Sequence, residues 1–139
     1  MIVLDTNVLS ELMKPAPADA VTRWFGRWAP ARLYTTAITE SEILHGIMLL
    51  TAGKRRNAFQ AAAQAMFGED FAGRILPFDS PAAHAYALIA ASRARSGKPI
   101  SHFDAQIAAI AHSAGASIAT RNVRDFDDCD VEVIDPWES

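Results

Sequence analysis

Short apolar runs alternate with longer amphipathic or alanine-rich segments along this chain. The apolar runs are rich in isoleucine, valine, leucine and threonine, which favour buried β-strands. Strands are expected at residues 2–4, 33–38, 75–78, 117–120 and 131–134. Helices are expected in the segments between them, at residues 7–13, 18–28, 39–50, 57–66, 80–96 and 104–114. This alternation of strands and helices predicts an α/β fold with a parallel sheet.

Proline and glycine mark several of the predicted helix ends. Lys14-Pro15-Ala16-Pro17 should end the first helix, because proline cannot continue it. Ser80-Pro81 places a capping residue before a proline at the first helical position. Gly97 and Gly115 follow the last two helices, where glycine commonly forms the C-terminal cap. None of these breaks indicates an interdomain linker or an internal repeat.

Composition and length indicate one globular domain spanning residues 1–139. Half of the residues are hydrophobic, 21% are charged, and the net charge of −3 argues against a generic nucleic-acid-coating protein, which would be basic. The lone cysteine, Cys129, excludes an intrachain disulfide and a cysteine zinc site, and it is typical of a reducing compartment. The first predicted strand leaves no room for a signal peptide, and no apolar run approaches the ~20 residues of a membrane span. We therefore expect a cytoplasmic protein with no membrane partner.

Acidic and amide side chains occur where predicted strands end or helices begin. Asp5 closes the first apolar run, Glu42 follows the second, and Asp104 opens an apolar helix. Asn122 and Asp125 follow the fourth apolar run. In an open parallel sheet, ligands bind outside the carboxyl ends of the strands, so these side chains are expected to share one pocket. Two carboxylates ~5 Å apart repel by roughly 3 kcal/mol at an effective dielectric of ~20, so the pattern indicates a hydrolase that uses a divalent cation.

Each acid also has a purely structural interpretation. Asp5 or Thr6 could cap the first helix, since aspartate and threonine are favoured at that position. Thr39-x-x-Glu42 and Ser101-x-x-Asp104 have the spacing of a capping box, the second with aspartate in place of glutamate. Taken singly, each acid fits capping better than catalysis. The two roles are compatible, because the helix dipole stabilises a carboxylate in the first turn.

Four blocks of sequence surround these residues in order along the chain. They are residues 4–11 (LDTNVLSE), 39–46 (TESEILHG), 104–111 (DAQIAAIA) and 119–126 (ATRNVRDF), with VIDPW following at 133–137. Together they resemble a PIN-domain ribonuclease toxin of the VapC family, close to its FitB-like branch. The resemblance runs from Ile2 to Trp137. It implies the PIN fold, a mostly parallel five-stranded sheet flanked by helices.

The resemblance also implies an activity. Such a protein is the toxin of a type II toxin–antitoxin system and a metal-dependent endoribonuclease that hydrolyses phosphodiester bonds in single-stranded or structured RNA loops. On the matching positions, Asp5, Glu42 and Asp104 take the metal-binding roles, with Mg²⁺ or Mn²⁺ as the cofactor. The chain departs from the family pattern at the fourth acid position. Asn122 could bind through its carbonyl oxygen, or Asp125 could supply the carboxylate, and both are candidate catalytic residues.

Partners follow from the same resemblance. It implies a VapB-type antitoxin, an RNA substrate, a homodimer, and a larger hetero-oligomer that reaches operator DNA through the antitoxin. Trp24, Phe25 and Trp28 share one face of a predicted helix. They could belong to the core or, where exposed, line a groove for an amphipathic antitoxin helix.

Several side chains are candidates for contacts to substrate. Thr6 could donate a hydrogen bond to an active-site oxygen, and Arg121 and Arg124 could contact backbone phosphates. Two further basic groups are better interpreted as solvated surface charges. They are Lys54-Arg55-Arg56 and the set formed by Arg93, Arg95 and Lys98.

The main competing hypothesis is a PIN protein with weak or no cleavage, acting as the antitoxin's partner in a DNA-binding autorepressor complex. The acid set argues for retained chemistry, since a scaffold does not need clustered acids. Glu42-x-x-His45 has the spacing of a di-iron motif, but those sites need two copies and this chain has one. The chain has no glycine-rich dinucleotide or P-loop motif, and it has no G-x-S-x-G motif of a serine hydrolase.

Overall fold

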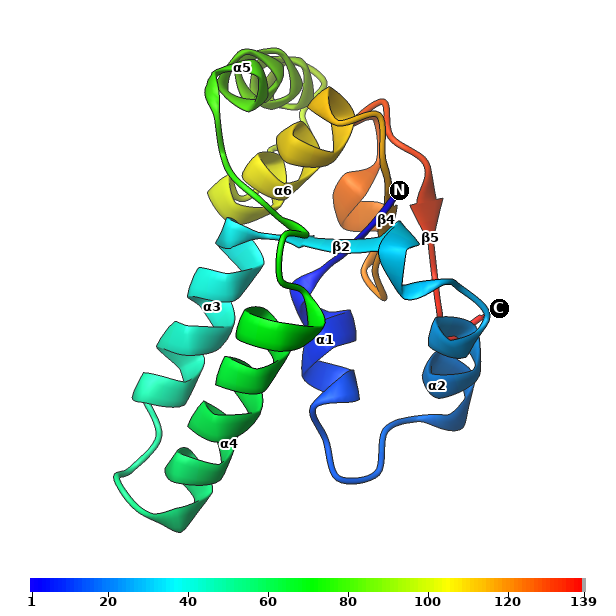
Figure 1. The fold of residues 1–139 in the computed structure, drawn as a ribbon. Coiled ribbons are helices and arrows are strands. Elements are labelled where there is room, and N and C mark those ends of the chain that lie inside the picture. Colours follow the sequence, from blue (N-terminus) through cyan, green and yellow to red (C-terminus); the bar gives the residue numbers. More distant parts are fainter. Residues whose placement is uncertain (139) are drawn as a thin grey trace.

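Five short strands form a fully parallel sheet within residues 1–138, the part of the chain that the structure describes. The computed structural model orders them β3-β2-β1-β4-β5 (Figure 1). Their bounds are β1 Ile2–Leu4, β2 Leu33–Thr36, β3 Ile75–Leu76, β4 Ser117–Ala119 and β5 Val133–Ile134. Because every neighbouring pair is parallel, the carboxyl ends of the strands lie along one edge of the sheet. The predicted α/β fold with a parallel five-stranded sheet is confirmed.

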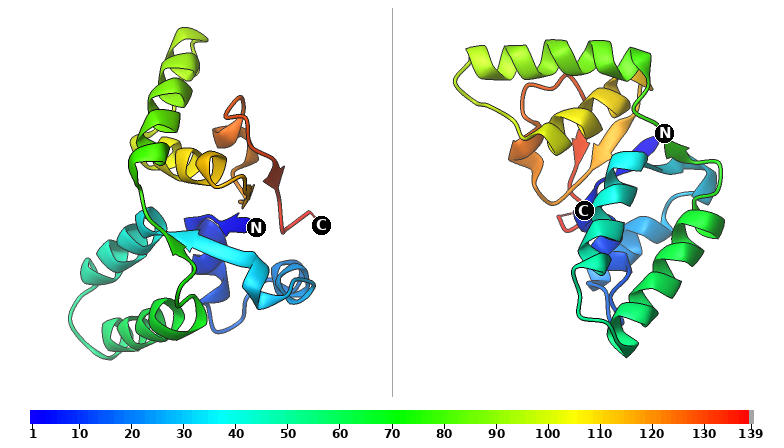
Figure 2. Two further views of the ribbon diagram at one scale, coloured as in Figure 1. Left: turned by 45° about the horizontal axis from the view of Figure 1, so that its top comes forward. Right: turned by 90° about the vertical axis from the view of Figure 1, so that its left-hand side faces the viewer.

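Helices lie on both sides of this sheet (Figure 2). The helices are α1 Thr6–Leu12, α2 Asp19–Gly26, α3 Ala37–Met48, α4 Lys54–Ala65, α5 Ser80–Arg95 and α6 His102–Ser113. Short helical turns are η1 Pro30–Arg32, the π-helical η2 Met66–Asp70 and η3 Val123–Phe126. Helices α1 to α4 lie on one side, and α5 and α6 lie on the other. Within residues 1–138, none of these helices has the length and apolar character needed to span a membrane.

The central strand β1 connects two separate hydrophobic cores. Ile2 and Leu4 pack in the cluster that includes residues of α1 to α4, whereas Val3 packs in the cluster formed with α5 and α6. Successive side chains of a strand point to opposite faces, so three consecutive apolar residues serve both layers. Each of the three is at most 3% exposed. Such complete burial is expected of a parallel strand with helices on both faces.

The start of α3 differs from the prediction. Strand β2 ends at Thr36, and the Thr36 hydroxyl accepts the backbone N–H of Thr39 at 3.0 Å. Thr39 therefore lies inside the first turn, and the predicted Thr39-x-x-Glu42 capping box is wrong. The Ser101 prediction is confirmed, because its hydroxyl accepts the backbone N–H of Asp104 at 3.1 Å at the start of α6.

The start of α5 also needs a correction. Asp79, not Ser80, is the capping residue, and its carboxylate accepts the backbone N–H of Ala82 at 3.1 Å. Pro81 then falls in the first turn, where its missing N–H leaves no helical hydrogen bond unmade. The two glycine caps are confirmed: Gly97 and Gly115 adopt φ values of +75° and +66°, which favour glycine over other residues.

Candidate active site

The candidate site lies where the carboxyl ends of β1 and β4 meet the first turns of α1 and α6. Asp5 directly follows β1, and its backbone N–H donates to the carbonyl of Ala119 in β4 at 2.9 Å. Asp104 lies in the first turn of α6, and Glu42 lies on α3, the helix that follows β2. Short connections after β1 and β2 position Asp5 and Glu42, whereas Asp104 reaches the same region at the start of α6, the helix that follows α5.

Asp5 is the most buried of these acids, with 5% of its surface exposed. One carboxylate oxygen, Oδ1, accepts the backbone N–H of Thr6 at 2.8 Å, which confirms Asp5 as the cap of α1. The other, Oδ2, accepts the hydroxyl of Thr120 at 2.8 Å and the side-chain amide of Asn7 at 3.3 Å. These contacts fix the orientation of the carboxylate between α1 and the end of β4.

Burial raises the pKa of Asp5 from 3.8 to about 6. The hydrogen bonds from Thr120 and Thr6 stabilise the charged form and oppose this rise, but they do not cancel it. The negative charges of Asp104 and Glu42 raise the pKa further. Asp5 is therefore a desolvated acid whose ionised form needs positive charge nearby.

Glu42 is partly buried and is held by a hydroxyl from α1. Thr6 Oγ1 donates to Glu42 Oε1 at 2.9 Å and lies 3.1 Å from the hydroxyl of Thr39. Burial raises the pKa of Glu42, the hydrogen bond from Thr6 lowers it, and the charge of Asp104 raises it again. Thr6 was predicted to donate a hydrogen bond to an active-site oxygen. In the structure the oxygen that accepts this bond belongs to the carboxylate of Glu42.

Asp104 is partly buried at the start of α6. Burial raises the pKa of its carboxyl group, and a hydrogen bond with the Ser101 side chain lowers it. The charge of Asp125 raises the pKa of Asp104, and the charge of Arg93 lowers it. Asp125 is therefore near enough to Asp104 for its charge to act on that carboxyl group.

The fourth corner of the site is η3 and the residue before it. Asn122 is exposed, and its backbone N–H donates to the Thr120 hydroxyl at 3.1 Å. Asp125 is also exposed, and its backbone N–H donates to the carbonyl of Asn122 at 3.1 Å. Both side chains are thus carried by one short turn that begins at the end of β4.

The predicted acids converge on one region without forming a complete coordination sphere. Across residues 1–138, no three Asp, Glu, His or Cys side chains are placed closely enough to hold a metal ion together. Their donor chemistry nevertheless fits a hard divalent cation, because every candidate ligand is a carboxylate or amide oxygen. Burial and neighbouring negative charge raise the pKa of Asp5, Glu42 and Asp104, and a bound cation would oppose both effects.

The three predicted phosphate contacts have different surroundings. Arg121 is exposed, and its guanidinium lies 5.0 Å from the centroid of the Trp137 ring. Arg124 is exposed on η3 beside Asp125. Thr6 already contacts Glu42, as described above. Both arginine side chains are therefore accessible from solvent, and Arg124 directly precedes Asp125 in the chain.

Two polar residues missing from the sequence-based site organise it. Asn7 donates to the Thr120 hydroxyl at 3.0 Å, and its carbonyl oxygen accepts the backbone N–H of Arg121 at 3.1 Å. Thr120 is completely buried and links Asp5, Asn7 and the backbone of Asn122. The sequence signal was weak, because these are single polar residues next to strand ends.

The prediction that Arg93 is a solvated surface charge is wrong. Its side chain is only 6% exposed. The helical spacing offered a signal, since Arg93 follows Ile89 by four residues on the face of α5 that also buries Ala82 and Ala85. Arg95, from the same basic group, is exposed as expected.

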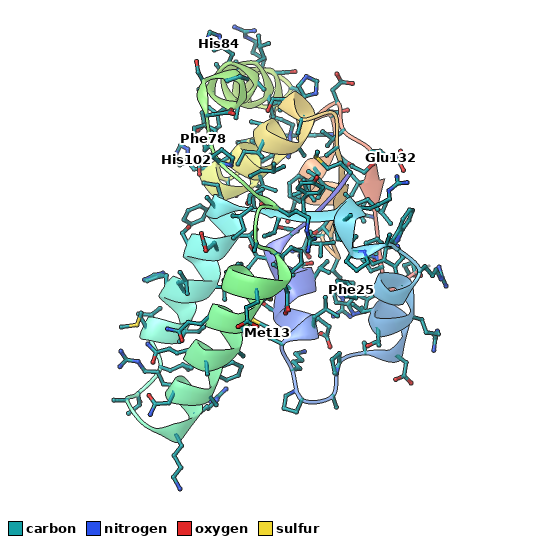
Figure 3. The ribbon with its side chains drawn as sticks, viewed as in Figure 1. Met13, Phe25, Phe78, His84, His102 and Glu132 are labelled. Atoms are coloured by element: carbon teal, nitrogen blue, oxygen red, sulfur yellow. The ribbon has the colours of Figure 1, made fainter. Side chains whose placement is uncertain are left out.

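The aromatic residues of α2 divide between the core and a surface cleft. Trp24 is 2% exposed and belongs to the core, while Trp28 is partly buried and packs against it with ring centroids 6.2 Å apart. Phe25 lines an apolar cleft of about 560 Å³ together with Leu12 and Met13. Figure 3 shows Met13 and Phe25 in the region between α1 and α2.

Comparison with known proteins places this arrangement in a family. The family model described as PIN domain matches residues 2–132. The chain is 43% identical over 138 residues to a protein of Sinorhizobium fredii named VapC ribonuclease Y4jK, covering 99% of both chains. It is 40% identical over 137 residues to Toxin FitB of Neisseria gonorrhoeae, again covering 99% of both.

A solved structure shows the same fold at similar identity. The structure described as FitAB bound to IR36 DNA fragment contains a chain that superposes with a TM-score of 0.92 at 40% identity. The match covers 99% of the present chain and 96% of the FitAB chain. The parallel sheet, the acids at its edge and these full-length matches agree with one another. The chain therefore belongs to the PIN-domain family, within the VapC and FitB group of toxins from toxin–antitoxin systems.

Proposed function

We propose that this chain is a toxin that acts as an endoribonuclease dependent on Mg²⁺ or Mn²⁺. One observation carries the proposal: Asp5, Glu42 and Asp104 come from separate parts of the chain, and each carboxyl group has a raised pKa. Desolvated acids that repel one another are typical of functional sites. The ribonuclease name of the Sinorhizobium fredii relative supports the same activity.

Asp5, Glu42 and Asp104 would hold the cation. When bound, the divalent ion would neutralise charge on a phosphodiester and make water more acidic. Asp5 would be the fixed member of the set, because three hydrogen bonds already orient it. Glu42 and Asp104 are only partly buried, so their side chains would adjust to complete the coordination.

The remaining residues would orient the site and the substrate. Thr6 would keep the Glu42 carboxylate turned toward the site, and Asn122 and Asp125 would complete its exposed side. Arg124 and, next to Trp137, Arg121 would contact phosphates that flank the scissile bond. Single-stranded RNA loops are the expected substrate, because their backbone and bases are accessible to a shallow site.

A VapB-type antitoxin would be the protein partner. The apolar cleft lined by Leu12, Met13 and Phe25 has a surface suited to the apolar face of an antitoxin helix. The related FitAB structure contains a bound DNA fragment, which supports a hetero-oligomer that reaches operator DNA. We expect the toxin to be a homodimer within that assembly.

A second candidate function is a partner in a repressor complex without cleavage. The DNA-bound FitAB structure favours this alternative, because repression alone would account for such an assembly. It leaves the acid cluster unexplained, however, since DNA binding through a partner does not need Asp5, Glu42 and Asp104 to lie together.

Cleavage assays distinguish the two functions. The purified chain, freed of antitoxin, is incubated with total RNA and Mn²⁺ or Mg²⁺ beside Asp5→Asn and Asp104→Asn. We expect discrete cleavage by the wild type that EDTA abolishes and that neither variant shows. Asp19→Asn, which changes an exposed acid on α2, serves as the control and should cleave like the wild type. A folded wild type that cuts none of these RNAs with either metal would favour the repressor function.

A further inference from the structure

Arg93 is a buried, permanently charged side chain close to the candidate site. It lies on α5 and is 6% exposed. Arginine stays protonated in proteins, so it cannot avoid the cost of burial by losing its charge. Burying a charge is costly unless its N–H groups find hydrogen-bond partners. The hydrogen-bond partners of the buried guanidinium therefore indicate its structural role.

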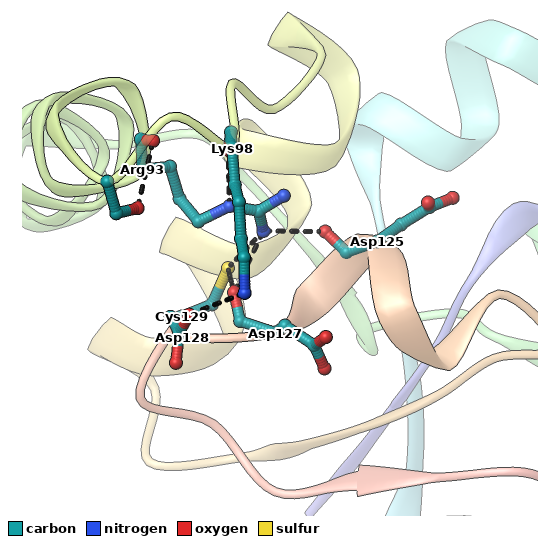
Figure 4. A network of polar contacts seen from close by, with 7 residues as sticks. Arg93, Lys98, Asp125, Asp127, Asp128 and Cys129 are labelled. Carbon is teal, nitrogen blue, oxygen red and sulfur yellow. Dashed lines mark hydrogen bonds and ion pairs between the residues drawn. The ribbon is translucent and has the colours of Figure 1, made fainter.

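The guanidinium joins two loops that are distant in sequence. Its Nε donates to the backbone carbonyl of Lys98 at 2.7 Å, in the connection between α5 and α6. Its Nη1 donates to the carbonyls of Asp125 at 3.0 Å and Asp127 at 2.8 Å, at the end of η3 (Figure 4). Nη1 also lies 3.7 Å from the sulfur of Cys129. Arg93 thus connects α5, the α5–α6 loop and the η3 segment.

Both contacts lie next to acids of the site: the α5–α6 loop leads into the turn of α6 that carries Asp104, and η3 carries Asp125. Lys98 lies three residues before Ser101, the residue that caps α6 and receives the backbone N–H of Asp104. Asp125 is anchored through its carbonyl, and Figure 4 shows its carboxylate pointing away from the guanidinium. The contact therefore restrains the backbone of Asp125 while leaving its side chain available.

The segment after η3 needs such restraint. Asp128 and Asp130 have φ values of 59° and 55°, in the left-handed region that aspartate tolerates better than most residues, although less readily than glycine. This stretch has no strand or helix between Phe126 and Val133. Its conformation must therefore be maintained by tertiary contacts, and Arg93 supplies one hydrogen bond to its first residue, Asp127, and one to Asp125 within η3.

The positive charge of Arg93 is buried among neutral hydrogen-bond acceptors. Its hydrogen-bond partners are three neutral backbone carbonyls and the sulfur of Cys129. These contacts compensate for the water that the guanidinium loses on burial. The role of Arg93 therefore lies in the backbone segments that its hydrogen bonds join.

We propose that Arg93 is a positioning residue of the active site: it clamps the α5–α6 loop to η3 and so sets the separation between Asp104 and Asp125. The inference rests on the proposed nuclease function, which it deepens by adding a residue that contacts neither substrate nor cation. Because Arg93 is buried behind the site, its loss should change metal affinity and turnover and leave the binding of RNA unaffected.

The test compares Arg93→Met, which removes the charge and the donors, with Arg93→Lys, which keeps the charge and part of the donor capacity. For Arg93→Met we expect kcat to fall about 10- to 100-fold, the range typical of residues that orient metal ligands. The Mn²⁺ concentration that gives half-maximal thermal stabilisation should rise by a similar factor. KM for RNA should change less than about twofold. Arg93→Lys should recover part of both losses, and Arg95→Met is the matched control on the exposed side of α5.

Hydrogen exchange measured by mass spectrometry adds a readout that needs neither metal nor RNA. In both Arg93 variants, peptides covering residues 98–104 and 121–130 should exchange faster together, while those of α1 and α3 should not change. A variant too unstable for activity assays can still be compared in this way, with Arg93→Lys as the milder change.

Two results would overturn the positioning role. The first is a folded Arg93→Met with wild-type kcat and wild-type metal response. The second is faster exchange spread over the whole chain, which would show that Arg93 only stabilises the fold. A wild type that neither cleaves RNA nor binds Mn²⁺ would refute the nuclease function instead, and the exchange of the two loops would still decide whether Arg93 holds them together.

Discussion

Asp5 is held by three hydrogen bonds and still resists ionisation. Hydrogen bonds from Thr6, Asn7 and Thr120 favour its charged form, but burial and two neighbouring carboxylates disfavour that form more strongly. The residue therefore combines a fixed orientation with an unfavourable charge. This combination is useful for binding a cation and costly in its absence.

The electrostatic cost at Asp5 predicts how stability depends on pH. Below pH 3.8 the Asp5 carboxyl group is protonated in both the folded and the unfolded chain. Between pH 3.8 and about 6 this group is ionised in the unfolded chain and protonated in the folded one. The folded state therefore loses stability as the pH rises through this window. About two pKa units correspond to roughly 3 kcal/mol. In urea unfolding with EDTA, we expect Asp5→Asn to gain about 2–3 kcal/mol relative to the wild type between pH ~4 and pH ~7.5. A difference that stays constant across this range would contradict the raised pKa.

At the scale of elements, the first turns of helices hold the site together. Asp5 begins α1 and Asp104 lies in the first turn of α6, so both carboxylates are close to free backbone N–H groups. Helix α5 contributes differently, through Arg93 near its C-terminal end. The position of Arg93 depends on where α5 starts, which is set by the Asp79 cap.

Substitutions at the start of α5 test which residue caps it. Asp79→Ala removes the acceptor for the Ala82 N–H and should lower the unfolding free energy by about 1 kcal/mol. Ser80→Ala should leave stability within about 0.5 kcal/mol of the wild type, as for most exposed substitutions. Chemical denaturation at neutral pH measures both. The reverse order of effects would show that Ser80 is the cap.

At the scale of the whole molecule, the sheet brings distant acids together. Asp5, Glu42, Asp104 and Asp125 span most of the chain; the first, second and fourth follow parallel strands, and Asp104 lies at the start of α6. The charges of Asp104 and Glu42 raise the pKa of Asp5, and the charge of Asp104 also raises the pKa of Glu42. A divalent cation would remove this repulsion, so binding should be visible in global stability.

Thermal unfolding with Mn²⁺ tests this coupling between site and fold. A ligand at 100 times its dissociation constant stabilises the folded state by about 2.7 kcal/mol, which raises the Tm of a domain of this size by several degrees. We expect that increase for the wild type, a much smaller one for Asp104→Asn, and a wild-type response for Asp19→Asn. Equal responses of all three proteins would place the ion elsewhere.

Much of the fold and part of the site can be predicted from local sequence. Apolar runs identified all five strands, and Gly97 and Gly115 identified two helix ends, because backbone conformation there depends on nearby residues. The capping residues were harder to predict, because two possible acceptors lie within a few residues of each helix start. Thr36 rather than Thr39 caps α3, and Asp79 rather than Ser80 caps α5. The matching blocks also predicted which acids share the edge of the sheet.

The sequence by itself determined the α/β class, the family and the identity of the acids. Only the tertiary structure decided how those acids are supported. Thr120 and Arg93 act through hydrogen bonds to residues 115 and 32 positions away, respectively, and no local pattern specifies such a contact. Burial depends in the same way on elements packed from elsewhere in the chain. For this reason Arg93 resembles a surface charge in the sequence and is a buried link between two loops in the folded protein.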